Sequence, residues 1–125
     1  MLPASSVDEV IMSDVKTGGQ KGSKPDRYDM IDIWPLRMLA RVYWWGSGRS
    51  DSKYPFRNWE KGFSWSLCYS AAMRHLNAFW AGEFWDPETK LPHLAHAAWQ
   101  CFVLMKFWKY KLGTDDRSRI DTWEV

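Results

Sequence analysis

The sequence predicts a mostly α-helical protein: a small bundle of two or three helices with long loops. Two stretches, within residues 64–82 and 93–112, repeat their apolar side chains at the 3.6-residue period of a helix. Strand-like alternation of useful length and internal repeats are both missing from the sequence. A length of 125 residues fits one domain with a single core.

The first 26 residues differ in composition from the remainder. They are rich in Ser, Gly, Lys and Asp, and the run at 17–25 offers little to bury. We expect residues 1–26 to form a flexible arm, or one ordered only by a ligand or partner. Residues 27–125 are then expected to form a single α-helical domain.

A first helix is predicted from about Pro35 to Trp45, because apolar residues are frequent there and Pro35 suits the first turn. Gly and Ser in residues 46–52 favour a loop, and Pro55 discourages helix just beyond it. We expect this loop to continue to Gly62.

The second helix is expected to be capped by Ser64 or Ser66 and to end near Gly82. A turn at 86–92 leads to a third helix from His93. The expected apolar faces are Leu67, Ala71, Ala72, Leu76, Phe79 and Trp80 on the second helix, and Leu94, Ala97, Cys101, Leu104, Met105, Trp108 and Leu112 on the third.

Aromatic residues are unusually abundant, with 10 Trp among 125 residues. Each packed ring buries about 150–250 Å², so we expect a dense aromatic core or an aromatic pocket. A small bundle leaves many of these rings exposed, and pairing with another copy would cover them. We therefore expect a homo-oligomer.

Charge and cysteine content narrow the choice of partners. A net charge of +2 is too small for a protein that binds many phosphates of duplex nucleic acid. Apolar runs fall short of the roughly 18–20 residues that span a bilayer, so we expect no membrane partner.

Cys68 and Cys101 lie in the apolar helical stretches, and no hydrophobic leader precedes them. We expect reduced core thiols in a cytoplasmic protein.

The segment between Arg74 and His96 contains all three histidines of the chain together with three carboxylates. His93 and His96 are three residues apart and so lie on one helical face, where two imidazoles can bind one metal ion. Glu83 and Asp86 lie at the end of the preceding helix and in the turn. We take Glu83, Asp86 and His93 as catalytic candidates. The candidate metal ligands are Glu83, Asp86, His93, His96 and His75.

Other roles for the same residues stay open. One histidine could cap the helix while the other packs in the core, and Glu83 and Asp86 could form a solvated turn. Glu88 could be a further ligand or base, or a loop cap. Carboxylates favour Mg²⁺ or Mn²⁺, whereas paired imidazoles favour Mn²⁺, Fe²⁺ or Zn²⁺. We expect a divalent metal, with Mg²⁺ or Mn²⁺ first.

Cationic and aromatic residues surround this segment in sequence. Arg74 could clamp a phosphate through its planar fork of donors, although each cation taken alone is more often a surface charge. A planar base could stack on one or two of the nearby tryptophans while the other rings form core. The candidates are Arg74, Lys61, Arg57, Lys24 and Arg27 for phosphate, and Trp59, Asn58 and Trp80 for a base.

Several motifs together resemble a phage and bacterial family named for dATP/dGTP diphosphohydrolase activity. They occur in the same order and with similar gaps, from about Lys16 to Arg117. The motifs are KPDRYDMI at 24–31, RNWEKG at 57–62, AMRHL at 72–76, FWAGE at 79–83, DPE at 86–88 and LPHLAHAA at 91–98.

The resemblance implies a nucleotide-binding domain at residues 27–125 that hydrolyses a purine deoxynucleoside triphosphate to monophosphate and pyrophosphate. It also implies distant similarity to MazG-like all-α pyrophosphatases, which use a Glu-x-x-Glu … Glu-x-x-Asp metal motif. Glu83-x-x-Asp86 reproduces only the second half, and His75, His93 and His96 would supply the missing ligands. No His-Asp dipeptide occurs, which disfavours an HD-type phosphohydrolase.

Three functions follow from these observations. The chain could be an enzyme that adjusts the nucleotide pool, plausibly encoded by a phage and active in the host cytoplasm. The missing half of the carboxylate motif instead favours a non-catalytic protein that sequesters a nucleotide or a nucleotide-derived defence signal. A third reading is a structural partner of another phage protein through an aromatic surface.

Overall fold

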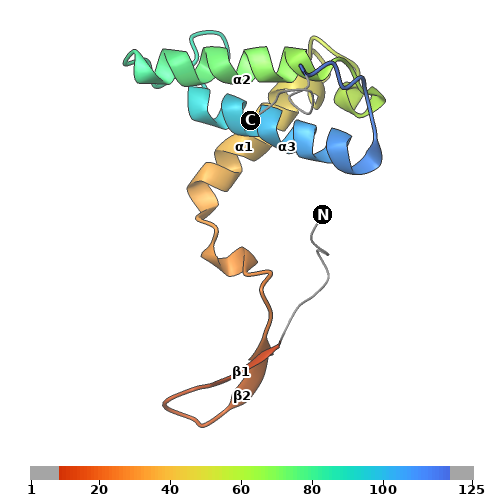
Figure 1. The fold of residues 1–125 in the computed structure, drawn as a ribbon. Coiled ribbons are helices and arrows are strands. Elements are labelled where there is room, and N and C mark those ends of the chain that lie inside the picture. Colours follow the sequence, from red (N-terminus) through yellow and green to blue (C-terminus); the bar gives the residue numbers. More distant parts are fainter. Residues whose placement is uncertain (1–8, 119–125) are drawn as a thin grey trace, which may run out of the picture. The chain divides into compact units, whose positions relative to one another are not determined.

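The computed structural model describes residues 9–118 and divides the chain into two compact units between Asp32 and Ile33. The N-terminal unit contains β1 (Val10–Ser13), β2 (Gln20–Ser23) and a short 3-10 helix at Tyr28–Met30. The second unit contains the three α-helices (Figure 1). The predicted mostly α class is confirmed for this unit.

β1 and β2 form an antiparallel hairpin within the segment where no regular structure was expected, with Val10 paired to Ser23 and Ser13 to Gln20. Hydrogen bonds in the turn between the two strands stabilise this hairpin. Oδ1 of Asp14 accepts hydrogen bonds from the backbone N–H groups of Lys16 and Thr17, both at 2.8 Å. The hairpin arises from this turn rather than from alternating apolar residues, which explains why periodicity did not reveal it.

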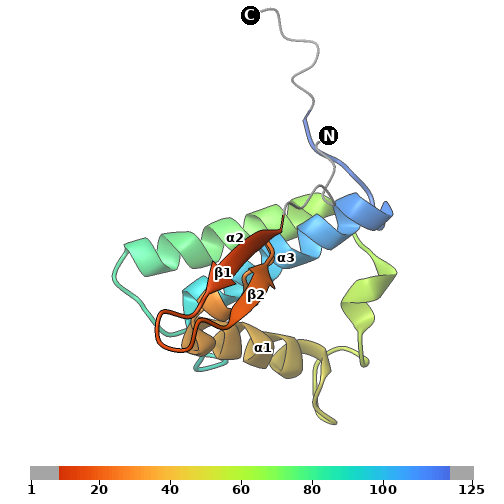
Figure 2. The same ribbon diagram turned by 90° about the horizontal axis from the view of Figure 1, so that it is seen from below.

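The second unit consists of α1 (Ile33–Ser47), α2 (Trp65–Trp80) and α3 (His93–Tyr110), with a 3-10 helix at Asn58–Lys61. α2 and α3 run side by side in both views, and α1 also packs against α3 (Figures 1 and 2). The observed helix starts and ends lie within two or three residues of those expected.

The core consists of two clusters that share Trp99. In one, α1 packs on the start of α3; in the other, α2 packs on the second half of α3. Burial of each large apolar side chain contributes about 1.5–3 kcal/mol. The buried members are Met38, Val42, Leu91 and Ala95 in the first cluster, and Trp65, Cys68, Val103 and Phe107 in the second.

The predicted apolar faces are wrong in part. On α3 the buried positions include Val103 and Phe107, whereas Leu94, Cys101, Met105 and Trp108 are exposed; on α2, Leu67, Leu76 and Trp80 are exposed. These helices are apolar around much of their circumference, so the neighbouring helices decide which side is buried.

The two cysteines have different environments. Cys68 is fully buried, whereas Cys101 is exposed, which corrects the expectation of two core thiols. Burial, with a smaller contribution from Cys101, raises the pKa of the Cys68 thiol to about 11. Cys68 is therefore a protonated packing residue at neutral pH.

The segment after α3 is fixed to the start of α2. The Trp65 side chain donates from Nε1 to the carbonyl of Leu112 at 2.9 Å, and its backbone N–H donates to Thr114 at 3.0 Å. Ser64 occupies the predicted capping position but makes no side-chain cap; the carboxylate of Asp116 instead accepts from the backbone N–H of Ser66 at 2.9 Å. A residue distant in sequence thus replaces the expected local cap.

A short loop between α2 and α3 positions the candidate site. Gly82, with φ of 106°, follows α2 as expected for a helix stop. The backbone of Asp86 donates to Leu91 at 2.8 Å and that of His93 donates to Phe84 at 2.9 Å, which closes residues 84–93 into a compact loop. This loop carries Asp86 and leads directly into His93.

Within residues 9–118, the longest helices are too short or too polar to cross a membrane.

Candidate functional site

All three histidines meet where the first turn of α3 lies beside the second half of α2. Nδ1 of His75, from α2, lies 2.8 Å from Nδ1 of His93, from α3. The His75 ring also stacks on His96, with 4.6 Å between ring centroids and 12° between planes. Helix packing therefore joins His75 to the pair that sequence spacing had already placed together.

Asp86 brings one carboxylate oxygen to the same point. Its Oδ2 lies 4.0 Å from Nδ1 of His75 and 3.9 Å from Nδ1 of His93. Each of the three side chains offers one donor atom, and these atoms lie within 4.8 Å of one another. Two imidazole nitrogens and one carboxylate oxygen form a donor set that could hold Mn²⁺, Fe²⁺ or Zn²⁺.

The loop holds Asp86 in its ionised form. Its Oδ1 accepts hydrogen bonds at 2.9 Å from the backbone N–H groups of Glu88 and Thr89. Burial opposes ionisation, but the hydrogen bonds from Thr89 and Glu88 outweigh it and lower the pKa of Asp86 below its usual value. Oδ2 thus faces the histidines as a negative charge.

Glu83 contacts the opposite nitrogen of His93. Its Oε1 lies 2.6 Å from His93 Nε2, and His93 itself is buried. When Nε2–H donates to this carboxylate, Nδ1 of His93 carries the lone pair and points toward His75 and Asp86. Carboxylates commonly orient metal-binding histidines in this way. The structure thus places Glu83 behind His93, on the side away from Asp86.

The surroundings of His75 and His96 favour uncharged imidazoles. Burial, then the neighbouring His96 and His93, lower the pKa of His75 to about 4. Burial also lowers the pKa of His96, although Asp86 acts in the opposite direction. Neutral imidazoles can accept a metal ion at neutral pH without first losing a proton.

Thr89 fixes His96 beside this group. Its Oγ1 lies 2.7 Å from His96 Nε2 and accepts a hydrogen bond from the backbone N–H of Leu91 at 3.2 Å. The loop that positions Asp86 therefore also positions His96. His96 stacks on His75 without being one of the three convergent donor groups.

A pocket of about 410 Å³ lies against His96, and we call it the aromatic pocket. Tyr43 and Trp59 meet edge to face within it, with ring centroids 5.6 Å apart. Asn58 and Gln100 contribute amide groups to a mostly apolar lining. This combination suits a planar heterocycle: rings for stacking and amides for its polar edge.

The predicted base contacts Asn58 and Trp59 both line the aromatic pocket, but Trp80 is 87% exposed at the end of α2 and is not part of the lining. Tyr43, Trp99 and Gln100 were missed from the sequence. Gln100 lies four residues after His96, so helical spacing from the histidine could have identified it.

The predicted phosphate ligands are dispersed. Arg74 is exposed on α2 next to His75, and Lys61 is exposed in the 3-10 helix. Arg57 pairs with Glu60, with Nε and Oε1 2.6 Å apart. Lys24 and Arg27 belong to the N-terminal unit, where Arg27 pairs with Asp29 at 2.9 Å.

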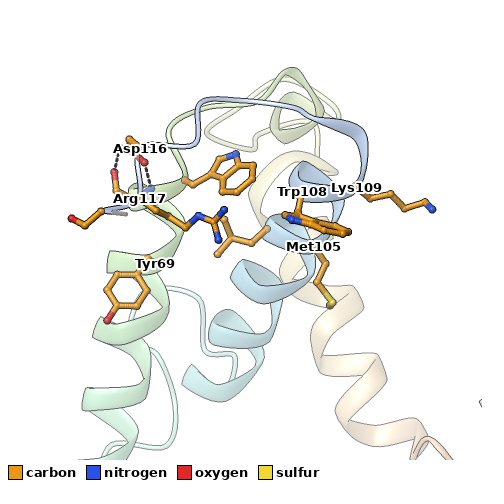
Figure 3. A pocket seen from close by; sticks show the side chains of 10 residues that line it. Tyr69, Met105, Trp108, Lys109, Asp116 and Arg117 are labelled. Carbon is orange, nitrogen blue, oxygen red and sulfur yellow. Dashed lines mark hydrogen bonds between the residues drawn. The ribbon is translucent and has the colours of Figure 1, made fainter. Parts of the chain in front are cut away.

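A larger groove, of about 900 Å³, lies elsewhere on the second unit. Figure 3 shows Tyr69 of α2 on one side, Met105 and Trp108 of α3 on the other, and Asp116 and Arg117 from the C-terminal segment. The histidines and Asp86 are absent from its lining. Although this groove is larger than the aromatic pocket, it is not the candidate site, because the candidate metal-binding side chains do not line it.

The second unit is thus a small helical domain with a partly buried histidine–carboxylate group beside an aromatic pocket. The chain matches the family model described as dATP/dGTP diphosphohydrolase, N-terminal, over residues 15–117, and it belongs to this family. The family name supports assignment as a hydrolase. Neither a curated protein nor a solved structure matches the chain.

Proposed function

We propose that the chain hydrolyses a purine deoxynucleoside triphosphate to monophosphate and pyrophosphate in a reaction that depends on a divalent metal. The observation that carries the proposal is the convergence of His75, Asp86 and His93 within 4.8 Å, with His96 connecting them to the aromatic pocket. The family name supports the same chemistry. Such an enzyme would adjust the nucleotide pool, and phage origin is part of the proposal.

The three donor groups fit a metal ion in chemistry and spacing. Two imidazole nitrogens that bind one ion at 2.0–2.1 Å lie roughly 3 Å apart, and the two Nδ1 atoms are 2.8 Å apart. The same distance also fits an N–H···N hydrogen bond between neutral rings. Oδ2 of Asp86 would have to move inward to join the two nitrogens, and we expect Mn²⁺ to suit this mixed set best.

A divalent ion bound there would stabilise negative charge on the phosphates and favour ionisation of water. In the reaction, the oxygen of water would bond to the α-phosphorus and the bond from that phosphorus to the α–β bridging oxygen would break. Pyrophosphate would leave, and the proton released by the water would pass to bulk solvent. Asp86 would hold negative charge at the site, Glu83 would keep His93 oriented, and Arg74 would offer a cation on the adjoining helix surface. The aromatic pocket would hold the base through Trp59 and Asn58.

The direct test is incubation with each deoxynucleoside triphosphate and Mn²⁺ or Mg²⁺, with products identified by mass. We expect pyrophosphate and a purine monophosphate. Asp86→Asn should abolish the metal-dependent product, because it removes the charged donor. Glu88→Gln changes an exposed carboxylate of the same loop and should retain activity. Equal activity of both variants would remove the three-residue group from the mechanism.

A second candidate is a protein that binds a nucleotide or nucleotide-derived signal without cleaving it. One observation favours it: Glu83 is engaged with His93, so Asp86 is the only carboxylate in the metal-binding group found among residues 9–118. The four-carboxylate motif of MazG-like enzymes is not reproduced. Recovery of an intact nucleotide in tight complex, with no product after incubation with metal, would support this candidate over the enzyme.

A further inference from the structure

Another pocket, of about 570 Å³, is lined in part by Thr89 and is rich in cationic side chains. We call it the cationic pocket. Arg41 comes from α1, Arg49 follows α1, and Lys90 comes from the loop before α3. Asp and Glu are absent from the described residues that line it. These three cations are different from the five that the sequence suggested.

Arg49 is held in place by aromatic rings and has an unused donor. Its Cζ lies 4.3 Å from the Trp45 ring centroid and 5.3 Å from that of Trp44. Its Nε is buried and makes no hydrogen bond within residues 9–118, although it forms a long ion pair with Oδ1 of Asp51 at 3.7 Å. Buried donors normally have an acceptor, so this atom indicates a ligand oxygen.

Lys90 is placed by an unfavourable backbone conformation. Its φ is 61°, in the left-handed region that long side chains rarely adopt. The backbone N–H of Lys90 donates to Asp86 at 2.8 Å, which fixes the residue within the loop. Strain of this kind persists where the surroundings require it, and it often occurs at ligand sites.

The cationic pocket adjoins the histidine group. Thr89 lines the pocket, and its Oγ1 lies 2.7 Å from His96 Nε2. His96 in turn lines the aromatic pocket and stacks on His75. His96 and Thr89 therefore connect three neighbouring features. These are the aromatic pocket proposed for the base, the candidate metal-binding group and the cluster of cations.

We propose that Arg41, Arg49 and Lys90 form a binding site for a pyrophosphate anion, either free or as the polyphosphate end of a nucleotide. Two guanidinium forks and an ammonium group match the several oxygens of such an anion. Its assignment to the leaving group rests on the proposed function, but binding of the anion itself requires no hydrolysis.

The test is calorimetric titration of the full chain with inorganic pyrophosphate in the presence of a metal chelator. We expect saturable binding at one site. Arg41→Gln and Arg49→Gln should each weaken it about tenfold or more, because each removes charged hydrogen bonds. Lys90→Asn removes charge while retaining a residue that tolerates positive φ, and it should also weaken binding. Arg41 is exposed, so its variant remains informative if Arg49→Gln fails to fold.

Two further variants distinguish specific binding of pyrophosphate in the cationic pocket from non-specific attraction to positive charge on the protein. Arg37→Gln makes the same charge change on the exposed surface of α1 outside the pocket and should leave affinity unchanged. Asp51→Asn removes the carboxylate that competes for Arg49 and should tighten binding, an effect that a purely structural Arg49–Asp51 pair would not produce. Absence of saturable binding, or equal losses in Arg37→Gln and Arg49→Gln, would overturn the proposal.

The hydrolysis assay distinguishes failure of this inference from failure of the proposed function. Pyrophosphate binding by a protein that cleaves no nucleotide would contradict the enzyme and leave the cationic pocket supported. Nucleotide cleavage with unchanged KM in Arg41→Gln and Arg49→Gln would support the enzyme and contradict the pocket.

Discussion

His93 is the residue on which the candidate site depends, because both of its ring nitrogens are engaged. Glu83 contacts one nitrogen at 2.6 Å, and His75 contacts the other at 2.8 Å. The ring is buried, so its orientation is fixed by these contacts and by the loop that precedes it. Glu83 and Asp86, three residues apart, would therefore have different roles in the proposed metal site: Glu83 would orient a ligand, and Asp86 would offer an oxygen.

This division of roles predicts a graded response to amide substitutions. Glu83→Gln should retain Mn²⁺ binding with affinity reduced about 10–100-fold, the usual effect of losing the partner of a ligand histidine. Asp86→Asn should abolish binding, because it removes a charged donor. Metal titration followed by calorimetry measures both effects. Equal losses in the two variants would show that both carboxylates bind the ion directly.

The low pKa of His75 predicts pH-dependent stability. The unfolded side chain has a pKa near its ordinary 6.5, whereas the folded value is about 4, so between these values the unfolded state binds more protons. The free energy of unfolding should therefore have its full value above about pH 6.5 and decrease as the pH falls toward 4. Urea unfolding at pH 7.5 and 5.0 measures the difference.

Two variants control this pH prediction. His75→Gln removes the titrating group and should reduce the loss of stability between pH 7.5 and 5.0, while Glu88→Gln should retain it. His96 also has a lowered pKa and should account for part of the remaining dependence. An unchanged pH dependence in His75→Gln would assign the effect to other groups.

At the scale of elements, hydrogen bonds join the segment after α3 to the start of α2. Gly62 and Gly113 both have positive φ, of 85° and 69°. A Cβ on Gly113 would overlap the backbone of Phe63, and one on Gly62 would overlap Gly113. The two chain segments can approach this closely only because both residues lack a side chain.

Gly113→Ala should therefore lower the free energy of unfolding by more than about 1 kcal/mol, through backbone strain and steric overlap. The matched control is Gly46→Ala. Gly46 lies in α1 with open space around its Cβ position, so alanine there should be neutral or stabilise by up to about 1 kcal/mol. Chemical denaturation compares the two. A stable Gly113→Ala protein would contradict the close approach.

Packing of α3 allows a second comparison between neighbouring aromatic residues. Phe107 is fully buried, whereas Trp108 is 51% exposed. Phe107→Ala should cost about 3–5 kcal/mol of stability, because it leaves a cavity between α2 and α3. Trp108→Ala should cost much less, despite removing a larger ring. Similar losses in thermal unfolding would show that the exposed face of α3 is also covered.

At the scale of the whole molecule, large apolar side chains remain exposed on every helix, including Trp44, Leu67 and Trp108. We propose that a second copy of the chain covers part of this surface, because apolar patches of this kind are typical of interfaces. Light scattering coupled to size-exclusion chromatography should then give a mass that is a multiple of 14.8 kDa. A monomer at micromolar concentration would contradict this proposal.

Local patterns in the sequence predicted the helices and the segment that contains the candidate site. Helical periodicity, Pro35 and Gly82 located the helices, and the spacing of His93 and His96 placed two imidazoles on one turn. These are local properties of the chain, set by backbone conformation within a few residues. Asn58 and Trp59, two of the predicted base contacts, both line the aromatic pocket, and their role in base binding stays a prediction.

Which side chains lie close together depends on how the three helices pack. Sequence spacing could not distinguish Glu83, which contacts the outer nitrogen of His93, from Asp86, whose Oδ2 faces both rings. Nor could it place Arg41 and Arg49 beside Lys90, or bury Phe107 in preference to Trp108. Helices that are apolar on several sides acquire a buried face only when α1 and α2 pack against α3, and this packing brings distant side chains into one site.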